Sequence, residues 1–498
     1  MLRKWSLHND YQEQLRLRMT DHLFIQGSRV LALDKSITKL YLLNLDPLLP
    51  VVKPLYPDLG RPAINQQGII RSLVLMLDQQ EYSITNWALK VASDPLLFDL
   101  CGFETDHGPA VASYYDLLVR FWLADYESHL RRKAKLKRFI SKPKKKLKAN
   151  QKLAPKREGV VKRLVKRALK GKINSFGPQV ILQKLLARVV VDVSAQMGIL
   201  GNTDNTSVAF DGSTFYTGAS HYGTKKCDCR KKGNYNCQCP RLYSDPDARF
   251  GWDSYRERWF FGDTLFNVTA ADSPYDLPIL IKMVQANRHD STTTVYALAD
   301  ILRLYPDLIF SSFLADGAMD NYPTYELLRH FKIIPFISLD TRTKAKFHYP
   351  HPDIASFDDQ GRPVCKGGKP FAYWGFCQPY RLKYRCWYTA KGQNPPEKCR
   401  CTESNYGKTI YLKSDLDPRM FTPVPRNSKV FKDKFKTRTT VERTNKRIFE
   451  DYAIEDYGAR STMIRAALAT FAAVNIHLDA WVKHEGFRFA DLLAHPAA

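Results

Sequence analysis

The chain has 498 residues and a formal net charge of +26 at pH 7, with a hydrophobic content (44%) ordinary for a globular protein with a substantial core. Its longest apolar stretch is interrupted by Asn475, His477 and Asp479, which excludes a membrane-spanning helix, and the start MLRKWSLHND lacks the apolar run of a signal peptide. We therefore expect a soluble, intracellular protein of about two to four folding units.

Residues 1–128 are predicted to form an all-helical N-terminal domain. In INQQGIIRSLVLMLDQQEYSITNWALKVASDPLLFDLCGF, apolar residues recur at three- and four-residue spacings, broken by turn signals such as Asp94-Pro95. The segment SYYDLLVRFWLADYESHLRR predicts a further amphipathic helix that runs into a basic segment. Cys101 lies in an apolar context and is expected in the core.

Residues 129–175 are predicted to be a basic linker. From Arg131 to Lys172 there are 20 Lys or Arg residues and a single acid, Glu158, so +19 of the net charge lies in 42 residues. Such a block favours polyanions, because each neutralised phosphate releases counterions. We expect nucleic acid as the partner, with Lys144, Lys145 and Lys146 contacting DNA; a solvated linker is the alternative.

Residues 176–345 alternate between strand and helix patterns. We expect a short strand, Val208 to Phe210, that stops at Asp211, and two strands around Gly262 and Asp263. Two helix patterns, TTTVYALADILRLYP and YPTYELLRHF, alternate with the strand patterns LIFSSFLADGAMD and KIIPFISLD. This order predicts an α/β core with a mixed sheet.

Two smaller features of this region have simple structural explanations. His289-Asp290 precedes a helix pattern, and we expect Asp290 to be its N-cap. Trp252 and Trp259 are expected to be core or strand residues, not platforms on which bases stack.

The remaining chain is predicted to interrupt and then complete the core. Residues 346–430 are rich in Pro, Gly, Tyr and Cys and contain short strand-like pieces, so we expect an inserted, mainly β, Cys-rich subdomain. Residues 431–498 are predicted to be C-terminal helices that complete the core.

The ten cysteines of an intracellular chain favour metal ligands or free thiols over disulfides. In CDCRKKGNYNCQC, two C-x-C pairs lie close together, and four such thiolates suit a tetrahedral, structural zinc ion; free thiols on a loop are the alternative. The ligands would be Cys227, Cys229, Cys237 and Cys239. For the irregularly spaced Cys365, Cys377, Cys386, Cys399 and Cys401, zinc and unpaired thiols both remain open.

Three acids have the composition of a phosphoryl-transfer site. Asp211 and Asp316 each stand at the end of a predicted strand, followed by glycine, although Asp-Gly is also the commonest turn dipeptide. Glu442 lies among Lys and Arg residues, and on a helix it would form an ion-pair ladder with Arg438 and Lys446. Alternatively, the three carboxylates would hold two Mg²⁺ ions about 3.5–4 Å apart.

These acids and their surroundings resemble the DDE transposases of bacterial insertion sequences. Phe435, Arg438 and Glu442 follow the family's spacing of aromatic residue, Arg and Glu, with phenylalanine for the usual tyrosine. Phe449 stands where the family has a lysine. The stretches LADGAMDNYPTYELLRHFKIIPFIS and DLPILIKMVQANRHDST, and the N-terminal GRP, are also similar to the family, so that the resemblance covers roughly two-thirds of the chain.

The resemblance implies an RNase H-like catalytic core and a transposase that cleaves the ends of an insertion sequence and transfers the strands. Asp211, Asp316 and Glu442 would hold two Mg²⁺ or Mn²⁺ ions, and Arg438, Arg443, Lys446 and Arg447 would bind phosphates. It also implies double-stranded DNA as partner, a homodimer on DNA, and a prokaryotic cytoplasmic location at the nucleoid. A non-catalytic nucleic-acid-binding protein and a nuclease without strand transfer are the alternatives.

Overall fold

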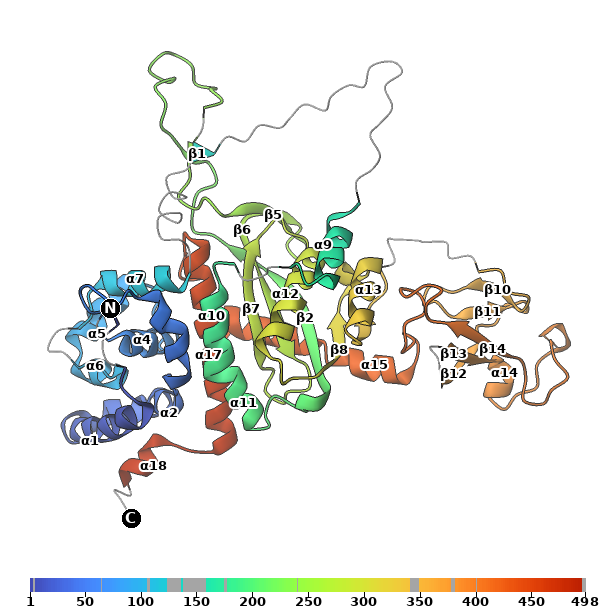
Figure 1. The fold of residues 1–498 in the computed structure, drawn as a ribbon, viewed down its shortest axis with the longest axis horizontal. Helices are drawn as coiled ribbons and strands as arrows, with labels where there is room; N and C mark the ends of the chain where they lie inside the picture. Colours follow the sequence, from blue (N-terminus) through green and yellow to red (C-terminus); the bar gives the residue numbers. More distant parts are fainter. Residues whose placement is uncertain are drawn as a thin grey trace.

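A mixed sheet lies at the centre of the computed structural model, with the N-terminal helices on one side and a small β-rich segment on the other (Figure 1). The predicted α/β core with a mixed sheet is confirmed. The structure describes residues 1–2, 5–63, 65–104, 108–122, 136–137, 158–173, 177–239, 241–340, 349–377, 381–399 and 401–494.

The N-terminal region consists of helices whose ends are set by their capping residues. Asp94 caps a helix by accepting from the backbone N–H of Leu96, Pro95 occupies its first turn, and Gly102 ends it with φ of 75°. Asp94-Pro95 is therefore a helix start. The elements are α1 (His8–Ala32), α2 (Asp34–Leu42), η1 (Asp46–Leu48), α3 (Leu49–Val52), η2 (Lys53–Leu55), α4 (Gln66–Asp78), α5 (Ile84–Ser93), α6 (Pro95–Cys101) and α7 (Val111–Phe121).

The central sheet combines an antiparallel half with a parallel half. Its strands are β2 (Thr206–Tyr216), β5 (Arg249–Asp253), β6 (Arg258–Ala270), β7 (Pro278–Gln285), β8 (Phe310–Ala315) and β9 (Ile334–Ile337). The order is β5-β6-β2-β8-β9, and β7 also pairs with β6. The strands β2, β5 and β7 are antiparallel to β6, whereas β8 is parallel to both β2 and β9.

Two strand boundaries differ from the prediction. The strand β2 does not stop at Asp211, because the next five residues continue the ladder with β6 as far as Tyr216. The strand β6 is a single strand, not two around Gly262. A Cβ atom at Gly262 would lie 2.1 Å from the carbonyl oxygen of Phe215, so this glycine permits close strand approach and does not mark a turn.

Crossover helices join the parallel strands. The helix α12 (Asp290–Leu304) connects β7 to β8, and α13 (Tyr322–His330) connects β8 to β9 after the short turn η5 (Gly317–Met319). The helix α9 (Val160–Leu169) belongs to the basic segment and packs against both α12 and α13. It buries Leu164 and Val165 there, so this end of the basic segment is attached to the core.

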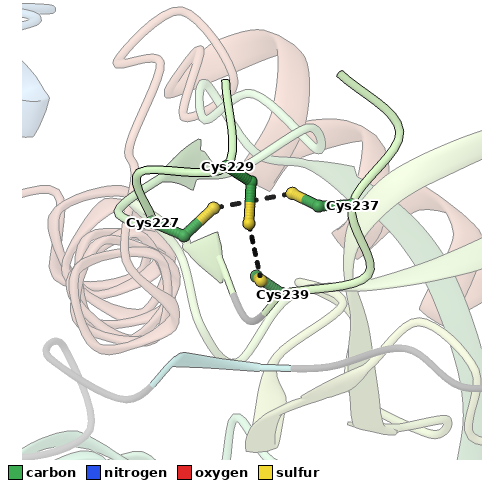
Figure 2. Close-up of side chains that lie close together, drawn as sticks. All are labelled: Cys227, Cys229, Cys237 and Cys239. Atoms are coloured by element: carbon green, nitrogen blue, oxygen red, sulfur yellow. Dashed lines mark hydrogen bonds between the residues drawn. The ribbon is translucent and has the colours of Figure 1, made fainter. Parts of the chain in front are cut away.

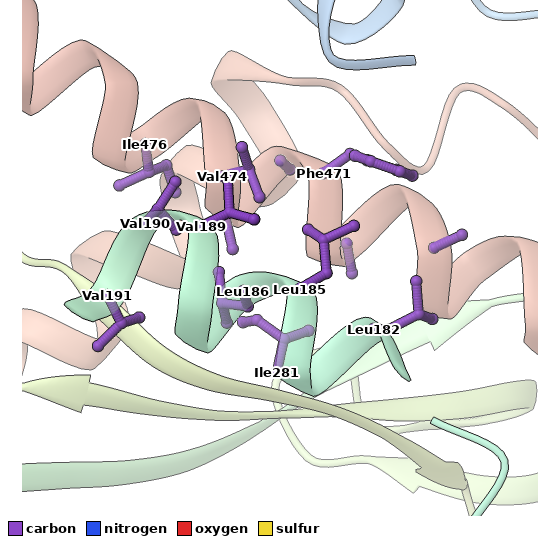
Figure 3. Close-up of a cluster of buried hydrophobic side chains, with 14 of the residues drawn as sticks. Leu182, Leu185, Leu186, Val189, Val190, Val191, Ile281, Phe471, Val474 and Ile476 are labelled. Atoms are coloured by element: carbon purple, nitrogen blue, oxygen red, sulfur yellow. The ribbon is translucent and has the colours of Figure 1, made fainter. Parts of the chain in front are cut away.

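A buried C-terminal helix joins the sheet to the N-terminal helices. The helix α17 (Thr462–Glu485) packs against α2 and α4, and also against β7 and α10 (Val180–Leu186). Figure 3 shows Phe471 and Val474 of α17 near Leu185 and Val189, with Ile281 of β7 beneath. One continuous cluster of buried apolar residues therefore extends from α1 to the sheet. The turn η3 (Ala187–Val191) and α11 (Asp192–Gln196) follow α10.

The segment between β9 and α15 (Lys429–Lys436) has a separate small core, made by residues such as Phe371, Leu382 and Leu412. It is joined to the main body by Arg419, which donates to the buried Asp320 at 2.7 Å, and by Arg426, which donates to the Tyr325 hydroxyl. Its elements are β10 (Ile354–Phe357), β11 (Pro363–Cys365), β12 (Ala372–Cys377), β13 (Arg381–Arg385), α14 (Trp387–Ala390), η6 (Glu397–Cys399) and β14 (Thr409–Lys413).

The chain returns to the sheet after this segment. The helix α16 (Thr439–Lys446) lies on β2 and β6, and α18 (Phe489–Ala494) packs on α2. Within the described residues, no helix combines the length and apolar character needed to cross a membrane. The other elements are η4 (Thr203–Asn205), the π-helical turn η7 (Arg447–Asp451), and a small sheet of β1 (Leu136–Lys137), β3 (Thr224–Lys225) and β4 (Arg241–Leu242).

Candidate functional site

Two of the predicted acids belong to neighbouring strands of the sheet: Asp211 lies on β2, and Asp316 directly follows β8. Ala209 of β2 pairs with Leu314 of β8 in parallel register, and continuing that register by two residues aligns Asp211 with Asp316. Asp316 directly follows the last residue of β8, as predicted. On its other side, Asp211 pairs with Asn267 of β6. Cross-strand neighbours face the same side of a sheet, so these three residues form one polar row.

The helix that carries Glu442 covers this face of the sheet. Ala209 and Leu314 form a small apolar cluster with Val441, the residue before Glu442. Residues two apart on a strand share a face, so the face with Ala209 is also the face with Asp211. The opposite face carries Val208 and Phe210, which belong to the main core.

Asn445 links α16 directly to the polar row. Its side-chain amide donates to Asp211 Oδ2 at 3.2 Å and to Ser213 Oγ at 2.8 Å. Its oxygen accepts from Asn267 at 3.1 Å. Because all these groups are buried or partly buried, the bonds fix both the carboxylate orientation and the position of the helix.

Glu442 forms half of the ion-pair ladder that its spacing suggests. Arg438 Nη2 donates to Glu442 Oε1 at 2.5 Å, and the Arg438 side chain is 19% exposed against 48% for Glu442. Lys446 pairs with Glu450 instead, at 3.5 Å. One face of the glutamate therefore remains open to solvent while its partner arginine lies in the site.

The pKa of Asp211 is raised chiefly by burial and further by the crowding of negative charge. Burial and the nearby charge of Asp316 raise it to about 6, while Arg438 acts in the opposite direction. The Asp316 carboxylate accepts from the backbone N–H of Ala318 at 2.9 Å, which holds it at the start of η5. Such crowding is typical of a site built to meet a cation.

A fourth acid, Asp290, adjoins the same region. The expectation that Asp290 is the N-cap of α12 is wrong, because His289 caps the helix by accepting from Ser291 and leaves Asp290 in the first turn. Burial, followed by the charges of Asp211 and Asp316, raises the pKa of Asp290 to about 7. A Cβ at Gly212 would lie 2.5 Å from Asp290 Oδ1, so this glycine provides space for the carboxylate.

All four predicted phosphate ligands around α16 have acidic partners within the protein, and those of Arg443 and Arg447 lie on other elements. Arg443 makes a two-point pair with Asp276, at 2.6 and 2.7 Å. Arg447 pairs with Asp479 of α17 at 3.2 Å. These bonds hold α16 and η7 against the loop before β7 and against α17. Lys446 is more open, at 66% exposed. Lys144, Lys145 and Lys146 lie outside the described residues.

The four cysteines of the hairpin between β3 and β4, called the hairpin cysteines below, lie close together as their spacing predicts. Figure 2 shows Cys227 facing Cys237 and Cys229 facing Cys239, each pair with sulfurs 3.5 Å apart. All four sulfurs lie within 4.8 Å of one another and could hold a metal ion. In the part of the chain that the structure describes, no other set of three or more Cys, His, Asp or Glu ligand atoms is this close. The carboxylate oxygens of Asp211, Asp316 and Glu442 are therefore farther apart than the four sulfurs.

A polar and aromatic groove opens beside the acids. It is lined by Gly212, Ser213, Trp252, Trp259 and Asp290, among others. Trp252 and Trp259 are cross-strand partners on β5 and β6, with exposed fractions of 52% and 67%. Both are strand residues, which confirms one of the two predicted placements, and their exposed rings show that they do not lie in the core.

Sequence reasoning missed the contributions of Asn445 and Asp290 to this site. Asn445 stands three residues after Glu442, which places both residues on adjoining parts of one helix face. That spacing was an available signal. Nothing in the local sequence around Asp290 distinguishes it from a capping residue, because its proximity to Asp211 depends on how α12 packs.

The comparisons with known proteins identify no relative, so the functional assignment depends on the geometry of the site. No family model, no curated protein and no solved structure matches this chain.

Proposed function

We propose that this protein is a DDE transposase with an RNase H-like core, which cleaves and transfers DNA strands at the ends of an insertion sequence. One observation carries the proposal: the strand register, continued two residues beyond Ala209 and Leu314, aligns Asp211 with Asp316, and the helix bearing Glu442 covers the same face. A mixed sheet with acids at its central strands supports the RNase H-like assignment.

The donor set fits magnesium or manganese. Asp211, Asp316 and Glu442 offer only carboxylate oxygens, the ligands that these hard cations prefer. Burial and the nearby charge of Asp316 raise the pKa of Asp211, and a bound cation would offset both effects. When bound, two such ions would activate the attacking hydroxyl and stabilise the leaving oxygen of the phosphodiester.

The protein's own residues would orient these ligands and the DNA. Asn445 holds Asp211 through its amide, and Arg438 holds Glu442. Arg443 and Arg447 position the helix through Asp276 and Asp479, and therefore act on the site indirectly. Lys446, with its exposed ammonium, is the best candidate on α16 for a direct phosphate contact.

The cysteine hairpin would hold structural zinc. Four thiolates leave no open position for catalysis, so the ion would stiffen a loop that carries Lys225, Lys226, Arg230, Lys231 and Lys232. This basic tip and the basic segment around Lys144 would bind double-stranded DNA, as the charge of +26 supports. A homodimer would bind the two DNA ends of the insertion sequence, one per protomer, at the nucleoid of a prokaryotic cell.

The test is a cleavage and strand-transfer assay on the DNA ends that flank the gene, with Mg²⁺ present. Asp211→Asn, Asp316→Asn and Glu442→Gln should each lower cleavage by at least about 1,000-fold, because each removes a ligand to the reaction centre. DNA affinity should change less than about threefold.

Matched controls separate the alternatives. Glu450→Gln removes an exposed acid from the next helical turn and should cleave normally. Full cleavage by any one of the three site variants removes that residue from the assignment. Cleavage without strand transfer would identify a nuclease, and binding without any cleavage by the parent protein would identify a non-catalytic nucleic-acid-binding protein.

A further inference from the structure

A buried arginine among the N-terminal helices has no acidic partner. Arg71 of α4 is 2% exposed, and its Nε and Nη2 atoms are buried without a hydrogen-bond partner. The nearby Asp46 carboxylate accepts from the backbone N–H of His8, at 2.9 Å, and not from Arg71. In the part of the chain that the structure describes, Arg71 forms no ion pair. A guanidinium removed from water without a counter-ion is strongly destabilising, so an anion beside it would be correspondingly favoured.

The unpartnered atoms are the two donors of one guanidinium edge. Nε–H and one N–H of Nη2 point in the same direction, which is the arrangement that binds two oxygens of one phosphate or carboxylate group. The plane of Arg71 is held by Tyr11, whose ring centre lies 3.4 Å from the guanidinium carbon. A Cβ at Gly102 would lie 3.3 Å from Nη1, so the other end of the guanidinium borders the backbone after α6. The side chain is therefore fixed with its two-donor edge unused.

The first turn of α4 lines a pocket together with Arg71. Asn65 is the N-cap of this helix, but its side chain makes no capping bond, and the first turn contains no acidic residue. The Gln67 side chain does not cap the helix either, because it bonds to the Ser6 backbone at 3.0 and 2.7 Å. The first amides of a helix lack intrahelical partners and favour a bound anion. The pocket is lined, among others, by Trp5, Gln66, Gln67, Gly68 and Arg71.

Trp5 adds a further donor to this pocket. Its indole Nε1 is buried without a hydrogen-bond partner, and this group can only donate. Glu104 also lines the pocket, but its side chain is exposed and accepts from Ser6 Oγ at 3.1 Å. The buried part of the pocket therefore presents N–H donors and one full positive charge. A water molecule could accept from these donors but would not offset the charge.

We propose that this pocket binds an oxyanion of the phosphate class, held at two points by Arg71 Nε and Nη2 and further by Trp5 Nε1 and the start of α4. Phosphate fits better than a carboxylate, because the donors beyond the two on Arg71 need an additional oxygen. Bound phosphate would link the segment before α1 to α4. The group would come either from a free anion or from the backbone of bound DNA. This inference does not depend on the reaction proposed above.

The first experiment is isothermal titration of the full-length protein with inorganic phosphate at pH 8, without DNA and at constant ionic strength in NaCl. Arg71→Lys keeps the charge but removes the two-donor edge. It should weaken phosphate binding at least about tenfold, the loss expected for one charge-assisted hydrogen bond. Acetate should bind the parent protein at least about tenfold more weakly than phosphate does. The proposal is overturned by the absence of saturable phosphate binding, by acetate binding as tight as that of phosphate, or by equal phosphate affinity in a folded Arg71→Lys variant.

Arg120→Lys is the matched control. The Arg120 guanidinium also lies over a tyrosine ring, that of Tyr56 at 4.6 Å. Its donors are used within the protein, by Asp116 at 2.8 Å and by the Leu55 carbonyl at 3.1 Å. This variant should bind phosphate like the parent protein. An equal loss in both arginine variants overturns the assignment to Arg71.

A second variant covers the case in which Arg71→Lys does not fold. Trp5→Phe removes one donor and keeps an aromatic ring, so phosphate affinity should fall at least about threefold. Unchanged affinity in this variant overturns the proposal.

A DNA duplex of random sequence identifies the source of the phosphate. If DNA supplies it, the duplex should displace inorganic phosphate, and Arg71→Lys should bind the duplex more weakly than the parent does. If the phosphate is a free anion, the duplex should leave phosphate bound. Displacement by a duplex whose own affinity is unchanged in Arg71→Lys would place phosphate binding elsewhere and overturns the proposal.

Discussion

Glu442 forms one of the two ion pairs that its sequence position suggests. Glu442 pairs with Arg438, but Lys446 pairs with Glu450 instead, so Glu442 has one of the two expected ion pairs. An exposed i,i+4 pair contributes only about 0.3–0.5 kcal/mol to stability. The small stabilisation from this pair does not by itself explain why position 442 is an acid. The pair is compatible with the proposed role of Glu442 as a metal ligand.

Phe449 occupies the position where the resembled family carries lysine. Its ring packs edge-on against Phe215 of β2, with ring centres 5.5 Å apart, and lies against the main core. A lysine at this place would put its charge beside apolar rings. The phenylalanine is thus explained by packing of η7 on the sheet, and any downstream cation must come from Lys446 or Arg447.

Asp290 yields a prediction about pH. Its pKa is raised from the ordinary 3.8 to about 7, so the folded chain keeps a proton that the unfolded chain loses near pH 4. The resulting penalty on stability is absent below pH 4, grows as the pH rises, and is complete above pH 7. In EDTA, Asp290→Asn should therefore raise the free energy of unfolding at pH 8 by up to about 4 kcal/mol, since each pKa unit corresponds to about 1.4 kcal/mol.

Urea denaturation at pH 8 and pH 5 tests this sign, and the gain should shrink at pH 5. Asp451→Asn is the control, since that side chain is 60% exposed and pairs loosely with Arg447 at 3.8 Å. An equal gain at both pH values would show that packing, and not charge, is responsible.

At the scale of elements, α16 is positioned by polar bonds more than by apolar contact. Val441 is its contribution to the small cluster on this face, while Asn445, Thr444 and Arg443 bond to β2, β6 and the loop before β7. Directional bonds specify the rotation of a helix more narrowly than apolar packing does. The orientation of Glu442 depends on that rotation.

A buried ion cluster fixes α17 to β6. Arg465 donates to Asp263 and Asp245, and all three side chains are at most 1% exposed. Arg465→Met would leave two buried carboxylates without a cation, and we expect a loss of about 3–5 kcal/mol in the free energy of unfolding. Guanidinium denaturation followed by circular dichroism measures it.

The control for that prediction is Lys436→Met, which removes a 77% exposed cation paired with Asp433 and should change stability by less than about 1 kcal/mol. Comparable losses in the two variants would mean that the buried ion cluster stabilises the protein no more than an exposed ion pair does.

For the whole molecule, α17 makes the N-terminal helices and the sheet one cooperative unit. Lys39 of α2 is 1% exposed and pairs with Asp78 at 2.5 Å and with Asp479 of α17 at 2.8 Å. Asn475 of α17 donates to the carbonyl of Val74 in α4. These bonds accompany the continuous hydrophobic cluster that crosses from α1 to β7.

Lys39→Met should therefore lower the stability of both regions together, by about 3–5 kcal/mol, because it leaves Asp78 and Asp479 partly buried without this cation. Tryptophan fluorescence and circular dichroism should still report one shared transition. The matched control is Lys35→Met, since Lys35 pairs with the same Asp479 but is 64% exposed. Two separate transitions in the parent protein would contradict a shared core.

Local sequence patterns were enough to predict the alternation of strands and helices, the end of β8 before Asp316 and the clustering of the four cysteines between β3 and β4. Each depends on residues close together in the chain: hydrophobic period, a turn after a strand, and ligands separated by a short loop. Local patterns suffice where the deciding contacts are local.

The other features of the site depend on contacts between distant parts of the chain. The extension of β2 past Asp211 depends on its ladder with β6, and the proximity of Asp290 to Asp211 depends on how α12 lies over Gly212. Asn445 reaches Asp211 across 234 positions of sequence. Several conformations fit the local sequence equally well, and pairing between distant segments selects one of them. The arrangement of this site could therefore not be deduced from Asp-Gly dipeptides alone.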